Sequence, residues 1–154
     1  MTQKTASGAS KEQPAIRTSE KAYRDNPEAN LAFISVPGEY AAIEVYRALQ
    51  HGKHVFLFSD NVSMGEEAFL KRTAAEKGLL VMGPDCGTAI INGIGIGFAN
   101  KVRAGNVGIA AASGTGLQEV ACLLQKGGLP STSLPQCGQG TGSEMIFFLG
   151  LKIR

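Results

Sequence analysis

Short apolar runs alternate with segments of helical periodicity along most of this 154-residue chain. The alternation predicts strands at residues 31–36, 55–58, 79–82 and 107–112, and helices near residues 39–50, 63–77 and 116–126. This order indicates an α/β fold with a four-stranded, doubly wound parallel sheet, right-handed crossovers and helices on both faces. Ligands of such folds bind outside the carboxyl ends of the strands, so the loops that follow the strands are the candidate site.

The loop after the fourth predicted strand has the composition of an anion site. It consists of small and hydroxyl-bearing residues: Ser113, Gly114, Thr115 and Gly116. The first amides of a helix have no partner within the helix, and the helix dipole adds a partial positive charge there, so a phosphate or carboxylate is favoured. A tight strand-to-helix turn packed through small residues is an equally good reading of the loop alone. The loop lacks a Walker A lysine and a complete G-x-G-x-x-G, so it predicts neither an ATP P-loop nor a standard dinucleotide site.

Local signals define three further elements. Thr18 precedes a short helix at residues 21–24, and Ser63 with Glu66 three residues later forms a capping-box pattern at the start of a longer helix. Residues 88–98 alternate in polarity about Asn92-Gly93, which predicts a β-hairpin.

The two ends of the chain lack these patterns. Residues 1–17 are small, polar and charged, and we expect a disordered lead or linker there. Residues 18–128 carry the predicted ligand-binding domain. Residues 129–154 are expected to form an irregular tail, because Pro130 and Pro135 fall where the next central strand would lie. The predicted sheet is therefore incomplete at its C-terminal end, as in a truncated chain.

Composition narrows the functional classes. The formal charge is +2 without a basic, aromatic-rich stripe, which argues against nucleic-acid binding, and no apolar run reaches the length of a membrane span. Cys86, Cys122 and Cys137 are odd in number, lack metal-ligand spacing and follow no secretory signal, so we expect a reducing cytoplasm. His51 and His54 belong to different predicted elements, so no metal site is expected.

A family resemblance rests on three strings, LAFISVPGEYAAIEVYRAL, VFLFSDNVS and GLLVMGPDCGTAIINGIGIGFANKVRAGNVGIAAASGTGLQEV. Together they resemble the α-subunit type of acyl-CoA synthetase in the succinyl-CoA synthetase superfamily, and they are most similar to its FdrA branch. The resemblance covers roughly residues 28–128, and GPDCG followed at this distance by SGTG is its specific part. It implies a Rossmann-like, CoA-binding fold, and the lead segment resembles the linker that precedes this domain in FdrA proteins.

The resemblance also implies where ligands bind. The pantetheine arm of coenzyme A would meet residues at the strand ends, namely Val36, Pro37, Phe58, Ser59, Asp60, Asp85 and Cys86. Phosphate would lie at Ser113, Gly114 and Thr115, with Gly116 completing the loop. We expect Cys86 to line the pocket rather than act as a nucleophile, because no histidine lies nearby in the sequence to activate it.

Three departures from the family pattern leave several functions open. No histidine occupies the context of the family's phosphohistidine, no early Gly-rich CoA loop precedes Leu31, and Asp85 replaces the family's asparagine. We expect the ligand-binding domain of an acyl-CoA synthetase-like protein, with an acyl or carbamoyl substrate and a second subunit or a missing C-terminal domain as its partner. The alternatives are a carbamoyltransferase component of allantoin and oxalurate catabolism that forms carbamoyl phosphate, a non-catalytic CoA- or nucleotide-binding module, and an inactive truncated product. No catalytic residue is assigned.

Overall fold

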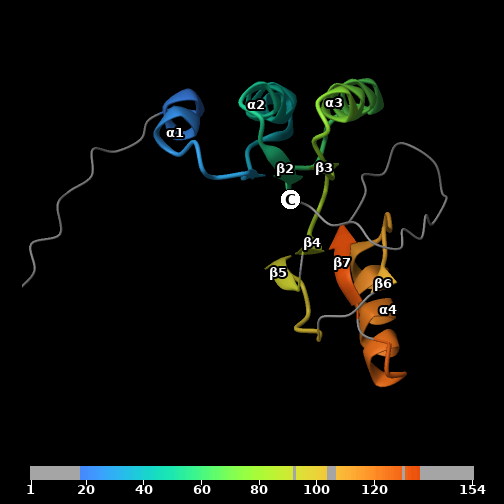
Figure 1. Ribbon diagram of the computed structural model, residues 1–154. Coiled ribbons are helices and arrows are strands. Elements are labelled where there is room, and N and C mark those ends of the chain that lie inside the picture. Colours follow the sequence, from blue (N-terminus) through green and yellow to red (C-terminus); the bar gives the residue numbers. More distant parts are fainter. Residues whose placement is uncertain (1–17, 92, 104–106, 130, 136–154) are drawn as a thin grey trace, which may run out of the picture.

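The computed structural model contains two small sheets joined by the loop that follows the third strand (Figure 1). It describes residues 18–91, 93–103, 107–129 and 131–135, the last of these by backbone alone. Within these residues, no helix has the length and apolar character needed to cross a membrane.

The first sheet is parallel, as predicted. Its strands are β1 (Leu31–Ile34), β2 (His54–Leu57) and β3 (Val81–Met82), in the order β1-β2-β3. Leu31 of β1 is in register with His54 of β2, and Val55 of β2 is in register with Val81 of β3. Each strand begins at or close to its expected position, and β1 and β3 are shorter than the predicted segments.

The helices of the first half also follow the sequence signals. They are α1 (Ser19–Asp25), α2 (Gly38–Gln50) and α3 (Met64–Glu76). Thr18 caps α1, and Ser63 with Glu66 forms the predicted capping box of α3. Hydrogen bonds from the Ser63 hydroxyl and backbone N–H lower the pKa of the Glu66 carboxyl.

The main core lies between the first sheet and helices α2 and α3. Residues of α2 at helical spacing, Ala41, Val45, Ala48 and Leu49, are fully buried there. Val55 and Leu57 of β2 face this cluster, whereas Phe56 between them belongs to a cluster on the opposite face. Side chains of successive strand residues point to opposite faces, so a continuous apolar strand such as β2 is covered on both sides.

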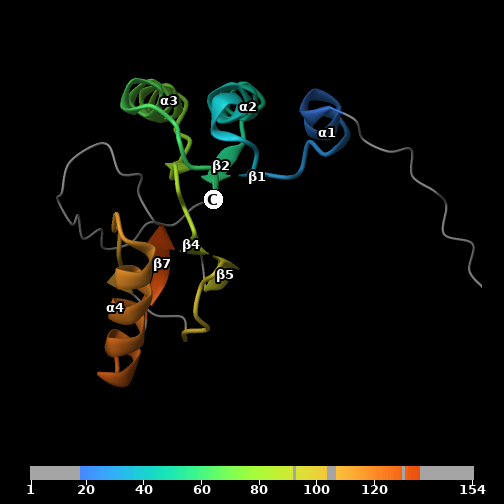
Figure 2. The same ribbon diagram turned by 180° about the vertical axis from the view of Figure 1, so that it is seen from behind.

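A β-hairpin, and not a helix, covers the second face of the first sheet. Strands β4 (Thr88–Ile91) and β5 (Ile94–Gly97) pair antiparallel, which confirms the predicted hairpin. Ala89 and the partly buried Ile91 and Ile96 pack with Phe56 and Met82. Figures 1 and 2 show α1, α2 and α3 together on the other side of the sheet. The expectation of helices on both faces of this sheet is therefore wrong.

The fourth predicted strand joins a second sheet. Strand β6 (Val107–Gly108) pairs parallel with β7 (Ser131–Pro135), and the order of this sheet is β5-β4-β7-β6. The prediction of a single four-stranded parallel sheet is wrong, because the chain leaves the first sheet after β3 and continues directly into β4. Helix α4 (Gly114–Lys126) packs on the second sheet through a cluster that includes Leu117 and Ala121.

Strand β7 also corrects the expectation that the chain after Gly128 is irregular. Its backbone lies between β4 and β6, with Pro135 opposite Ala89. Pro130 precedes the strand and Pro135 is its last residue, so both prolines lie outside the strand interior, where a missing N–H would break the ladder. The expectations for residues 1–17 and 136–154 fall outside the described residues.

His54 makes the stability of the first sheet dependent on pH. Its Nδ1 accepts a hydrogen bond of 3.0 Å from the backbone N–H of Leu80, which requires an unprotonated nitrogen, and burial lowers the pKa of the imidazole below 6.5. Because the folded state disfavours the protonated form, stability is full above pH 6.5 and decreases as the pH falls through that value. We expect a loss of about 1 kcal/mol, the scale of one hydrogen bond, in urea denaturation at pH 5 relative to pH 7.5.

The control for this prediction is His54→Gln, which should flatten the dependence below pH 6.5. His51→Gln removes the other histidine, which contacts the Glu20 carboxylate at 3.1 Å, and keeps the His54–Leu80 hydrogen bond, so the dependence assigned to His54 should remain. Identical pH profiles for the wild type and His54→Gln would contradict the assignment.

Candidate functional site

The loops that follow β1, β2 and β3 are held together through the second of them. The backbone N–H of Val36 donates to the Ser59 hydroxyl at 2.9 Å, and the N–H of Asp85 donates to the Ser59 carbonyl at 2.9 Å. The N–H of Cys86 donates to the Leu57 carbonyl at 3.0 Å. Three of the predicted strand-end segments therefore form one connected edge, as expected for the carboxyl ends of parallel strands.

Two glycines permit this close approach. Gly38 lies so near the next loop that an added Cβ would stand 2.5 Å from the Asp60 carbonyl oxygen. At Gly83 an added Cβ would stand 2.4 Å from the Leu57 carbonyl oxygen, and the φ angle of +100° is one that other residues rarely adopt. The geometry of this edge thus depends on positions without side chains.

The predicted anion loop forms the start of α4. Ser113 is the N-cap, and its hydroxyl accepts from the Gly116 N–H at 3.1 Å and lies 3.3 Å from the Thr115 hydroxyl. The N–H groups of Gly114 and Thr115 occupy the first two positions of the helix, where no intrahelical acceptor exists. The helix begins at Gly114, two residues before the predicted start. Gly114 does not adopt a positive φ.

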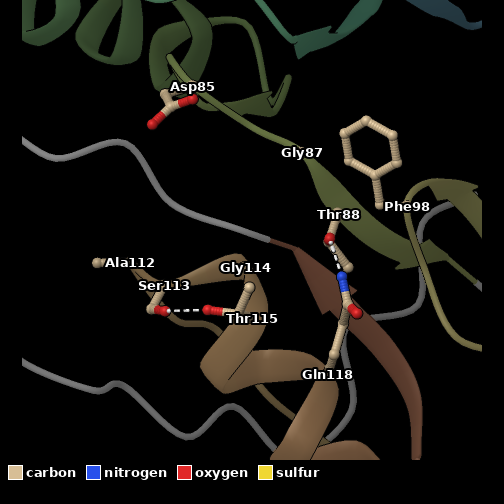
Figure 3. A pocket seen from close by; sticks show the side chains of 9 residues that line it. All are labelled: Asp85, Gly87, Thr88, Phe98, Ala112, Ser113, Gly114, Thr115 and Gln118. Carbon is tan, nitrogen blue, oxygen red and sulfur yellow. Dashed lines mark hydrogen bonds between the residues drawn. The ribbon is translucent and has the colours of Figure 1, made fainter.

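A hollow of about 690 Å³ brings this helix start next to the loop after β3 (Figure 3). Its lining residues are Asp85, Gly87, Thr88, Phe98, Ala112, Ser113, Gly114, Thr115 and Gln118. The Gln118 amide donates to the Thr88 hydroxyl at 2.7 Å and so ties α4 to the start of β4. The volume is in the range of small-molecule sites.

A second hollow of about 440 Å³ lies at the ends of β2 and β3. It is lined by Asp60, Asn61, Val62, Met64, Glu67, Pro84 and Asp85. Glu67 is buried and pairs with Lys71 at 2.6 Å. Asp85 borders both hollows, so this residue connects the hollow at the predicted phosphate loop with the hollow at the ends of β2 and β3. Its φ of +57° is in the left-handed region, which aspartate and asparagine tolerate better than most residues.

The structure places the predicted site residues in three groups. The first hollow is lined by Asp85, Ser113, Gly114 and Thr115. The second is lined by Asp60 and, again, by Asp85. Val36, Pro37, Phe58, Ser59 and Gly116 line neither hollow, and Ser59 instead connects the loops from a buried position. Cys86 is fully buried, with its thiol 3.6 Å from the Thr88 carbonyl, so the expectation that it lines the pocket is wrong.

Three polar or aromatic lining side chains were not predicted from the sequence. Thr88, Phe98 and Gln118 come from β4, the segment after β5 and the second turn of α4. Their meeting depends on the packing of α4 against β4 across the second sheet. Gln118 alone had an indirect signal, since it lies one helical turn after Gly114.

Comparisons with known sequences give one close but functionally unassigned relative and two ligase subunits. The chain is 54% identical over 120 residues to the uncharacterized protein YahF of Escherichia coli (strain K12), covering 78% of the chain and 23% of YahF. It is 27% identical to subunit SauD of the ADP-forming sulfoacetate-CoA ligase of Bilophila wadsworthia, covering 79% of the chain and 43% of SauD. It is 30% identical to subunit alpha 2 of the ADP-forming succinate-CoA ligase of Archaeoglobus fulgidus, covering 72% of the chain and 40% of the subunit. No protein-family model matches the chain.

Solved structures show a shared fold. ATP citrate lyase of Methanothrix soehngenii, in complex with citrate and coenzyme A, superposes with a TM-score of 0.71 at 19% identity, over 79% of the chain and 22% of the enzyme chain. The dinucleotide-forming acetyl-coenzyme A synthetase 1 of Ca. Korarchaeum cryptofilum gives 0.56 at 20% identity, over 75% of the chain and 27% of the enzyme chain. The chain shares its fold with part of these enzymes. It spans about a quarter of YahF and two fifths of the two ligase subunits, so it corresponds to a portion of each.

Proposed function

We propose that the chain is a CoA- and phosphate-binding portion of an acyl-CoA synthetase-like protein. The observation that carries the proposal is the first hollow, in which the start of α4 faces the loop after β3 (Figure 3). These two segments contain SGTG and GPDCG, the specific part of the family resemblance. The CoA-ligase relatives and the CoA-bound neighbour support the assignment of the ligand.

The residues present fit a phosphate group at α4. The Gly114 and Thr115 amides point out of the helix start, and the dipole of a thirteen-residue helix favours an anion there. The hydroxyls of Ser113 and Thr115 add hydrogen-bonding capacity at the same place. Coenzyme A would supply a thiol for acyl transfer when bound, and the loop edge at Asp60 and Asp85 would hold its pantetheine arm.

The assignment to the FdrA branch is part of this proposal. It rests on Asp85 in the string GPDCG, where the wider family has asparagine. No histidine of the chain lies in the first hollow, so a complete reaction would require residues from a partner subunit or a further domain. We therefore propose ligand binding, and not turnover, as the activity of this chain by itself.

Calorimetric titration of the full chain with coenzyme A and with inorganic phosphate tests the proposal. Gly114→Val should weaken phosphate binding at least tenfold, because a branched side chain obstructs the approach of the ligand to the amides. Thr115→Ala should weaken it by about fivefold or less, the equivalent of roughly 1 kcal/mol for one hydrogen bond, because the amides remain. Circular dichroism of both variants checks that they remain folded.

The outcomes separate the functional classes. Failure of the wild type to bind either ligand would refute the proposal. Binding of phosphate without coenzyme A would refute the CoA assignment and favour the carbamoyltransferase component that forms carbamoyl phosphate. Equal binding by the wild type and a folded Gly114→Val would place the phosphate site away from α4.

A further inference from the structure

Phe98 is a large apolar side chain on the wall of the first hollow. Its exposed fraction is 68%, although it directly follows β5, whose Ile96 packs on the first sheet. Figure 3 shows it beside Gly87 and Thr88, away from Ser113 and Thr115 at the start of α4. The hollow thus has an aromatic wall and, separately, a polar wall with N–H and hydroxyl groups.

The position of Phe98 is fixed by its neighbours. Its backbone N–H donates to the Gly87 carbonyl at 2.8 Å. Gly97 before it has a φ of +69°, and an added Cβ there would stand 2.4 Å from the same carbonyl oxygen. The Phe98 ring meets the Phe58 ring edge-on, with 5.8 Å between the centroids. A preorganised side chain loses little conformational freedom when a ligand packs on it.

The same hairpin provides a comparison. Ile94 at the start of β5 is as exposed as Phe98, at 69%, but it lines neither hollow. Exposure alone therefore does not distinguish Phe98. What distinguishes it is an exposed aromatic ring on the wall of a cavity, and small-molecule sites combine such apolar walls with a few polar groups.

We propose that Phe98 is a specificity-determining residue, and that the ligand of the first hollow is a phosphate ester carrying a flat or apolar group that packs on the Phe98 ring. This inference rests on the proposed function for the position of the phosphate at α4. The apolar group belongs either to coenzyme A or to a second phosphorylated ligand. Contact of such a group with the Phe98 ring would make this ligand bind more tightly than inorganic phosphate, which makes the phosphate contacts alone.

Phenyl phosphate tests the inference, with inorganic phosphate as the reference and the full chain as the protein. We expect the wild type to bind phenyl phosphate about five times more tightly than inorganic phosphate. A difference in affinity of this size is within the range that one contact between aromatic rings contributes. Phe98→Ala should abolish this preference and leave the affinity for inorganic phosphate within about twofold. Phe98→Tyr, which retains the ring, and Ile94→Ala, which removes the matched exposed side chain, should both keep the preference.

A wild type that binds both phosphates equally, or a Phe98→Ala that keeps the preference, would overturn the inference. Coenzyme A binding by the same wild type would show that the proposed function survives such a result. If the wild type binds none of phosphate, phenyl phosphate and coenzyme A, both this inference and the proposed function would be overturned. A parallel loss of coenzyme A affinity in Phe98→Ala would assign the apolar group to coenzyme A, and an unchanged affinity would assign it to a separate phosphorylated ligand.

Discussion

Gly83→Ala is expected to lower the free energy of unfolding by roughly 3 kcal/mol or more. The φ of +100° at Gly83 is strained for a residue with a side chain, which costs about 1–3 kcal/mol. The added Cβ would also stand 2.4 Å from the Leu57 carbonyl oxygen and 3.1 Å from the Cys86 Cβ. Relieving this overlap requires backbone movement, which costs a further 1–3 kcal/mol or so. Urea denaturation followed by far-UV circular dichroism measures the loss.

Gly78→Ala is the matched control for this prediction. Gly78 has a φ of +66°, but an added Cβ would have no atom within 4 Å. The loss should therefore be limited to the left-handed backbone conformation, about 1 kcal/mol. Equal losses for the two variants would mean that the loop after β3 relaxes freely and that its contact with β2 is not a fixed feature of the site edge.

The first half of the fold was predictable because its signals are local. Apolar runs bounded by caps and turn residues located β1, β2 and β3, and Ser63 with Glu66 located the start of α3. Parallel pairing of the three strands follows from their alternation with helices. Parallel strands place their carboxyl ends at one edge of the sheet, so the loops after β2 and β3 lie close together. Asp60 and Asp85 therefore border one hollow.

The second half depends on contacts that no local pattern encodes. A two-residue strand such as β6 carries no information about its partner, and the choice of β7 over β3 is made by tertiary packing. Prolines suggested an irregular segment after Gly128, but they occur before and at the end of β7, where they leave its interior intact.

The candidate site was predictable to the extent that it is made of loops. The structure brings four residues of the predicted site to one hollow, namely Ser113, Gly114, Thr115 and Asp85, and their role in ligand binding stays a prediction. Cys86 was misplaced because the direction of a side chain at a strand end depends on one residue of register, and here it points into the core. Phe98 reaches the site through the hairpin, so only the three-dimensional arrangement reveals it, whereas the position of Gln118 one helical turn after Gly114 was an indirect sequence signal.

Gly38→Ala is expected to lower the free energy of unfolding by roughly 2 kcal/mol, although alanine is the better helix former. Gly38 is the first residue of α2, and an added Cβ would stand 2.5 Å from the Asp60 carbonyl oxygen and 2.9 Å from the Asn61 carbonyl oxygen. These are backbone atoms of the neighbouring loop, so the overlap must be relieved by separating the loops after β1 and β2.

Gly65→Ala provides the control, because Gly65 lies in the first turn of α3 with no atom within 4 Å of an added Cβ. There the helix propensity of alanine should raise the free energy of unfolding by about 0.5 kcal/mol. Opposite signs for the same substitution at two helix starts would show that contact between the loops, and not helix propensity, determines the residue at position 38; equal signs would refute this.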